Sequence, residues 1–301
     1  MDRQQFTQQL IKHTRSMIPL LRYLVLQTET HAFCLALACA ALLGFFPFCV
    51  LLLSIARNVL RWPGAFDVGI AAVQAYFPSG QDIVIRNLHV AVDVAGGRLS
   101  ISSVFWVFLG AAGVFIPLEA GLNRLWKVEK DRPYWRNQIV GFTLTVACCF
   151  LALAFIALNA LIRAPLNFII PFELLQTIIN VTILKVTGIA FFIIAIFVFY
   201  KFLPNRRIDT MQVLPAAILA GLVGAIVKEV FVLALPFTRI DVTQGPFDVS
   251  ISFVLLAYFE TFVVLGGAFL STQSEAYPWM AFMTPRKKMS FEPPSPPGGP
   301  N

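Results

Sequence analysis

The chain has 301 residues, of which 58% are hydrophobic and only 13% are charged, and its mean hydropathy is +0.76. Soluble domains carry about 25% charged residues, and so little polar side chain could not cover this much apolar surface in water. The composition therefore excludes an ordinary soluble protein and indicates a single domain surrounded by lipid. The formal charge of +7 is explained more simply by Lys- and Arg-rich cytoplasmic loops than by nucleic-acid binding.

Residues 1–30 form the first predicted unit, a cytoplasmic amphipathic segment. Basic residues such as Arg15 and Arg22 accompany apolar residues such as Met17 and Leu21, which recur at roughly helical spacing. The pattern is typical of a helix that lies on the membrane surface. An ordinary helix packed beneath the bundle explains it equally well.

Six apolar runs follow, each long enough to cross a hydrocarbon core about 30 Å thick, which takes about 20 helical residues. They predict an all-α polytopic membrane protein with six transmembrane helices in a membrane domain of residues 31–272. Gly44 and Pro47 predict a kink in the first span. The predicted spans are residues 32–56, 101–119, 138–161, 177–202, 211–236 and 249–271.

The connections between the spans are more polar. Residues 57–100 predict an extracytoplasmic segment that is partly helical: residues 83–94 fit a short amphipathic helix, which we favour, although their valines also alternate as in a strand. Pro165 and Pro171 predict a short loop between the third and fourth spans. Residues 273–301 are rich in proline and predict a disordered cytoplasmic tail.

The distribution of basic residues predicts the orientation. With the N-terminus inside, 15 Lys and Arg residues lie on cytoplasmic segments, if Lys201 at the end of the fourth span is counted with the loop that follows it, and 6 lie outside. Lys185 and Lys228 lie farther inside their spans. Cytoplasmic loops carry the excess of positive charge in membrane proteins. We therefore expect a multi-pass protein of the bacterial inner (plasma) membrane with both termini in the cytoplasm.

No catalytic or metal-binding constellation is evident. The five cysteines lie in apolar runs, without the spacing of a metal site or a disulfide framework, and the three histidines lie on different segments. No HExxH, GxSxG or P-loop motif occurs. We expect no metal, no cofactor and no enzymatic activity.

Four charged residues within the predicted spans are the candidate substrate-binding residues: Lys185, Lys228, Glu229 and Glu260. A charge in the membrane costs roughly 2.5–3.5 kcal/mol on insertion scales, so each needs a partner or water. One interpretation is a polar cavity in the outer half of the last three helices, in which the lysines meet an anionic group. The other is internal ion pairing, for example of Lys185 with Glu260, that only fixes helix packing.

Lys228 and Glu229 are adjacent in the sequence. Neighbouring residues lie about 100° apart around a helix. We therefore expect at least one of these two side chains to face a different helix.

Several segments resemble the YihY/BrkB family of bacterial inner-membrane proteins over about residues 25–272. The likeness depends on the order and spacing of the segments more than on any one of them. They are Phe46-Pro47 in the first span, Leu122-Asn123-Arg124-Leu125-Trp126, the basic stretch to Arg132-Pro133, Phe202-Leu203-Pro204-Asn205-Arg206, and the Ala/Gly-rich fifth span with Lys228. The family-motif residues are accordingly Pro47, Asn123, Trp126, Arg132 and Pro204.

The resemblance implies six transmembrane helices and an undefined activity. The family has carried the label "ribonuclease BN", which is regarded as a misannotation. One member is associated with serum resistance in a pathogen, and some relatives are linked to envelope lipid or lipopolysaccharide traffic. The family commonly has Gly-Ala-Glu near the end of the sixth helix, where this chain has Gly267-Ala268-Phe269.

Three functions are compatible with these features. The in-span charges favour a transporter or lipid-handling protein of the cell envelope. The basic cytoplasmic face and the Pro-rich tail are also compatible with a non-catalytic scaffold of an envelope complex. A membrane-bound ribonuclease has only the family label in its favour. The expected partners are membrane lipids, including anionic lipids, and a second copy of the chain is a further candidate; no nucleic-acid partner is expected.

Overall fold

The computed structural model describes residue 23 and residues 26–59, 61–76, 81–94, 101–129, 132–169, 172–238 and 247–272. Most of the predicted amphipathic segment 1–30, the whole tail 273–301 and Pro171 lie outside the described residues. The helices are α2 (Thr28–Ser54), the π-helical turn η1 (Ile55–Val59), α3 (Pro63–Tyr76), α4 (Gln81–Val94), α5 (Ile101–Leu125), α6 (Tyr134–Ile169), α7 (Glu173–Phe202), α8 (Thr210–Thr238) and α10 (Asp248–Thr272).

The described residues contain no strand, so the all-α prediction is confirmed for them. Each predicted span corresponds to one helix, with ends that agree within a few residues except in α5 and α6. Five helices in the described part of the chain are long and apolar enough to cross a membrane: α2 with η1, α6, α7, α8 and α10. The protein is therefore a polytopic membrane protein. The predicted second span lies in α5, which has 25 residues but is not among these five.

The helix α6 corrects one prediction, because Pro165 lies inside it and not in a loop. With 36 residues, α6 is roughly 54 Å long at 1.5 Å per residue, more than a hydrocarbon core requires. In lipid a backbone without hydrogen bonds is costly, so a chain tends to stay helical through a proline and loses a single bond there.

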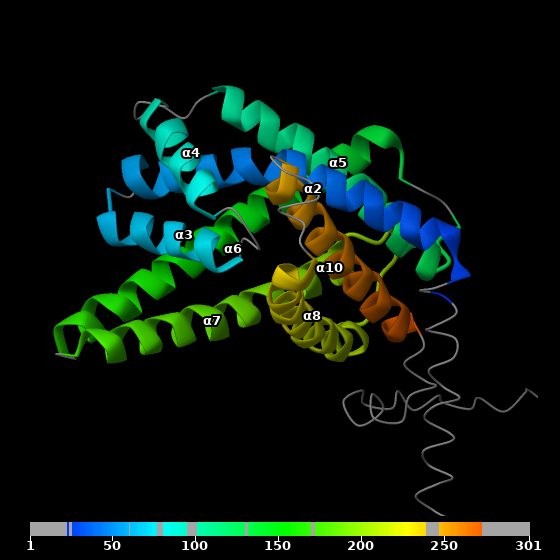
Figure 1. The fold of residues 1–301 in the computed structure, drawn as a ribbon. Helices are drawn as coiled ribbons and strands as arrows, with labels where there is room; N and C mark the ends of the chain where they lie inside the picture. The colour runs from blue at the N-terminus through cyan, green and yellow to red at the C-terminus, as the bar shows by residue number, and fades with distance from the viewer. Residues whose placement is uncertain are drawn as a thin grey trace, which may run out of the picture.

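Most of the described residues between α2 and α5 are helical. Residues 83–94 lie in α4, as favoured, and the strand alternative for them is wrong. Val84, Leu88 and Val92 are buried on one face of α4, at the spacing of an amphipathic helix. The sequence did not predict the preceding helix α3. In Figure 1, α3 and α4 lie at the same end of the molecule as the end of α6 and the start of α7, and the start of α2 lies at the opposite end.

The helices pack closely through small residues. Helix α2 packs against α5 and α10, and α8 packs against α7 and α10. Gly44 of α2 faces Gly110 of α5 so closely that a Cβ built on Gly44 would lie 3.1 Å from the Cα of Gly110. Tyr200 of α7 is fully buried, and its hydroxyl donates a hydrogen bond to the carbonyl of Val264 in α10. These contacts fix the helices around the charged residues of α7, α8 and α10.

Candidate functional site

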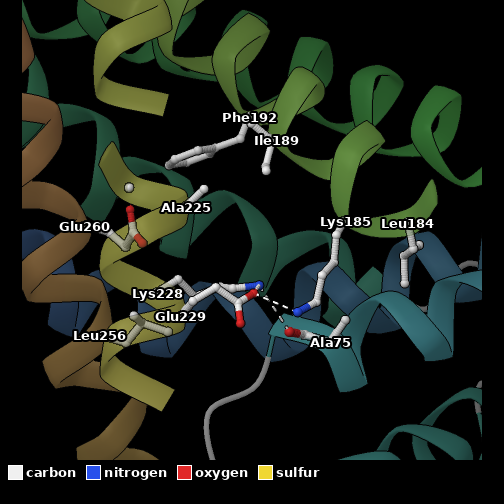
Figure 2. Close-up of a pocket in the computed structure, with 11 residues that line it drawn as sticks. Ala75, Leu184, Lys185, Ile189, Phe192, Ala225, Lys228, Glu229, Leu256 and Glu260 are labelled. Carbon is white, nitrogen blue, oxygen red and sulfur yellow. Dashed lines mark hydrogen bonds and ion pairs between the residues drawn. The ribbon is translucent and has the colours of Figure 1, made fainter. Parts of the chain in front are cut away.

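The four charged residues predicted from the sequence line one cavity of about 510 Å³. Lys185 belongs to α7, Lys228 and Glu229 belong to α8, and Glu260 belongs to α10. Figure 2 shows these side chains together with Ala75, near the end of α3. We call this space the charged cavity.

Two ammonium groups share one carboxylate in the charged cavity. The Nζ atom of Lys185 lies 3.1 Å from Oε1 of Glu229, and Nζ of Lys228 lies 3.3 Å from the same oxygen. The Lys228 ammonium also donates a hydrogen bond to the carbonyl of Ala75, at 3.4 Å. The Lys228 side chain is only 12% exposed, whereas those of Lys185 and Glu229 are each 47% exposed. The Lys185–Glu229–Lys228 triad therefore carries one net positive charge.

Lys228 and Glu229 both line the charged cavity, and they contact different helices, as expected: Lys228 bonds Ala75 of α3, and Glu229 pairs with Lys185 of α7. The four methylene groups of the lysine also let its ammonium reach its neighbour's carboxylate. One detail of the sequence prediction is wrong, because the ion pair suggested between Lys185 and Glu260 is absent among the described residues. Lys185 pairs with Glu229.

Glu260 stands apart from the triad. Its Oε2 atom is buried and has no hydrogen-bond partner within the described ranges. Gly224 makes room for this carboxylate, since a Cβ there would lie 2.6 Å from Oε2 and 2.9 Å from the ring of Phe192. Burying a carboxylate oxygen without a hydrogen bond is costly, although the charge of the nearby Lys228 attracts this carboxylate. The structure thus places a polar group with unused bonding capacity in the cavity wall.

Most of the remaining wall is apolar. Leu184, Ile189 and Phe192 of α7 and Leu256 of α10 line the charged cavity beside the charged groups. Pockets that bind small molecules typically measure about 300–1,000 Å³ and combine apolar walls with a few polar groups. The charged cavity can therefore accommodate a molecule with a charged part and an apolar part.

A second polar cluster joins the connection before α6 to the loop after α7. The Arg132 guanidinium donates hydrogen bonds to the carbonyls of Leu203, at 2.9 Å, and Pro204, at 3.2 Å, and to Oδ1 of Asn205, at 3.2 Å. Its Nη1 atom lies 3.4 Å from Oε1 of Glu119, whose side chain is 3% exposed. The guanidinium thereby satisfies carbonyls at the C-terminal end of α7, where positive charge is favoured.

Asn123 extends this cluster. Its Oδ1 atom accepts a hydrogen bond from the backbone N–H of Asn205, at 2.8 Å, and its Nδ2 atom lies 3.5 Å from Oε1 of Glu119. Arg206 donates a hydrogen bond to the carbonyl of Trp126, at 3.0 Å. We call Glu119, Asn123, Arg132 and Asn205 the Arg132 cluster; these contacts hold the two connections together.

The structure therefore unites four of the five family-motif residues, namely Asn123, Trp126, Arg132 and Pro204, and leaves Pro47 within α2. Sequence reasoning missed the role of Glu119. A carboxylate at the end of a predicted span, on the same helix face as Asn123 four residues later, was the signal that could have revealed it.

Comparison with known proteins gave two matches. The family model of the virulence factor BrkB matches residues 25–278. The chain belongs to the BrkB family. A UPF0761 membrane protein of Rhodospirillum rubrum is 24% identical over 248 residues, which cover 77% of this chain and 53% of that protein. The chain thus aligns with about half the length of this relative. No solved structure matches the chain.

In the described part of this BrkB-family chain, no group of three or more His, Cys, Asp or Glu side chains could hold a metal ion. Cys34, Cys39, Cys49, Cys148 and Cys149 are all free thiols.

Proposed function

We propose that this BrkB-family protein is a transporter or lipid-handling protein of the bacterial inner membrane, without enzymatic activity, and that the charged cavity is its substrate site. The observation that carries the proposal is the convergence of Lys185, Lys228, Glu229 and Glu260, from three helices, on one cavity. Placing four ionisable groups in lipid-crossing helices is costly, and within the described residues ion pairs join Lys185, Lys228 and Glu229.

The composition of the charged cavity favours an amphipathic anion as the substrate. The triad offers two ammonium groups and one net positive charge to an anionic headgroup. Leu184, Phe192 and Leu256 offer an apolar wall to a hydrocarbon chain. Anionic membrane lipids combine these two parts, so they are the proposed partners, and nucleic acid is not.

The proposed topology has six spans, with α5 as the second and with both termini in the cytoplasm. The excess of Lys and Arg on the segments assigned to the cytoplasm supports it. In this orientation the charged cavity lies in the outer half of the membrane, beside the end of α3. The Arg132 cluster then lies on the cytoplasmic side.

The test is a lipid-translocation assay in liposomes that contain the purified protein and fluorescently labelled phosphatidylglycerol. We expect wild-type protein to translocate the lipid faster than empty liposomes do. The Lys185→Ala/Lys228→Ala variant should be slower than wild type by about tenfold or more. Each charged hydrogen bond to an anion contributes about 1.5–3 kcal/mol, and about 1.4 kcal/mol corresponds to a factor of ten in rate.

The matched control is Arg86→Ala, which removes an exposed cation of α4 outside the charged cavity and should leave the rate unchanged. Equal rates for wild type and empty liposomes would contradict lipid translocation. That outcome would favour a non-catalytic scaffold. The Lys185–Glu229–Lys228 ion pairs support this alternative, because in a scaffold they would serve only to fix α7 against α8.

A further inference from the structure

A second cavity, of about 450 Å³, lies at the opposite end of the helices. It is bounded by residues just before α2, the end of α5, the loop before α8 and the end of α10, and it shares no lining residue with the charged cavity. Its charged lining residues in the described part of the chain are all cations: Arg124, Lys127 and Arg206. We call it the basic cavity.

The end of α5 explains how Lys127 reaches the basic cavity. The N–H of Lys127 donates to the carbonyl of Arg124, at 3.1 Å, and the N–H of Val128 donates to the carbonyl of Asn123, at 2.9 Å. This pair of bonds is the Schellman motif that ends many helices. Lys127 occupies its left-handed position, with φ of 50°, where glycine is favoured because other residues are strained.

The three cations of the basic cavity make few strong interactions with the described residues of the protein. Arg124 lies 2.7 Å from Glu29, in a pair whose side chains are 63% and 53% exposed, and exposed pairs of this kind are weak. Arg206 uses one N–H for the Trp126 carbonyl, and a guanidinium has five N–H donors. The Lys127 ammonium forms no hydrogen bond or ion pair with the described residues.

A buried donor adds an independent observation. Trp126 lines the basic cavity and is only 6% exposed, yet its indole N–H has no hydrogen-bond partner among the described residues. A buried donor of this kind normally has a partner. The wall also contains Tyr23, whose ring stacks on Phe269 at 4.8 Å, and burial raises the pKa of the Tyr23 phenol, so this hydroxyl stays protonated.

We propose that the basic cavity binds a phosphate group, carried by a membrane lipid or present as free phosphate. Guanidinium groups match phosphate oxygens in a bidentate geometry, and an ammonium group adds a point charge. The basic segments at this end of the helices and the Tyr and Trp side chains in the wall are typical of the headgroup region of a membrane. This site is independent of the substrate site proposed above.

The test measures binding to the full-length protein in neutral detergent, with short-chain phosphatidylglycerol, short-chain phosphatidylcholine and inorganic phosphate as the three probes. We expect phosphatidylglycerol to bind and raise the melting temperature of the protein. Phosphatidylcholine should bind at least about tenfold more weakly, because its own choline cation would lie near the three cations of the basic cavity. Inorganic phosphate that competes with phosphatidylglycerol at similar concentration would identify the phosphate group alone as the ligand. Binding of the lipid without such competition would identify the lipid headgroup.

The decisive variant is Lys127→Gly, because it separates binding from folding. Glycine relieves the left-handed strain, so the protein without ligand should melt at the same temperature as wild type or higher, while phosphatidylglycerol affinity falls by about tenfold. The control Arg207→Gln removes an exposed cation next to Arg206 that does not line the cavity, and it should bind like wild type.

A charge placed in the wall gives a second test. Phe269→Glu should abolish phosphatidylglycerol binding, whereas Phe269→Leu should retain it, because both lose the stacking on Tyr23 and only one adds a carboxylate. Equal affinities for the two lipids, or equal losses in Lys127→Gly and Arg207→Gln, would overturn the proposal and leave only general attraction between a basic surface and anions.

Discussion

Replacing Arg132 with alanine is expected to destabilise the folded protein by about 3–5 kcal/mol, the cost typical of removing one partner of a buried ion pair. The Glu119 side chain is 3% exposed and the Arg132 side chain 17% exposed, so water can replace little of the lost interaction. The carbonyls of Leu203 and Pro204 lose their donors in the same step. The measurement is denaturant- or heat-induced unfolding of the purified protein in detergent.

The control for this change is Arg136→Ala, in the first turn of α6. Arg136 is exposed, and surface substitutions usually change stability by no more than about 0.5 kcal/mol. Adding Glu119→Gln to Arg132→Ala should recover part of the loss, because the double variant no longer buries an uncompensated charge. Equal stability of Arg132→Ala and Arg136→Ala would show that the Arg132 cluster does not hold the two connections together.

Gly110→Ala is expected to destabilise the protein by about 1–3 kcal/mol or more, the usual cost of overpacking a tight interior. A Cβ at Gly110 would overlap the backbone of Gly44, and a backbone cannot rotate away as a side chain can. Helices α2 and α5 would have to move apart, which weakens the close approach that small residues permit in membrane proteins. Thermal unfolding in detergent measures the effect.

Two further Gly→Ala changes test whether the loss of stability follows the closeness of the helix contact. Gly44→Ala should cost less, because its Cβ would lie 3.1 Å from the nearest atom, and Gly141→Ala in α6 should be neutral or stabilising, since its Cβ would meet nothing closer than 3.6 Å. Alanine also has a higher helix propensity than glycine. If all three variants unfold alike, close packing of α2 on α5 does not determine stability.

The helices were predictable because lipid leaves a crossing chain few alternatives. A long apolar run must satisfy its own backbone, and a helix does so within one segment. That argument located α2, α5, α6, α7, α8 and α10 without any knowledge of packing. It could not find α3, because residues 63–76 are too short to span the membrane and too apolar to show a clear amphipathic period.

The charged cavity was predictable in its members and not in its pairing. The energetic cost of charge in lipid singled out Lys185, Lys228, Glu229 and Glu260 without any structural information. Which lysine meets which carboxylate depends on the rotation of α7 relative to α8, which the sequence does not specify. The Arg132 cluster was harder still, because Arg132 and Leu203 are 71 residues apart and meet only through the geometry of two connections.

The hydrogen bond from Lys228 to Ala75 links the occupancy of a membrane cavity to the position of a short helix outside the five long spans. Ala75 lies in the last turn of α3, where helix carbonyls lack partners of their own, so the ammonium supplies one. An anion that attracts Lys228 away from this carbonyl would release the end of α3. Suppose that α3 is fastened in place, for example with an engineered crosslink that preserves the bond to Ala75. Thermodynamic reciprocity then requires the affinity for the anion to fall by the same factor by which the anion favours release of α3.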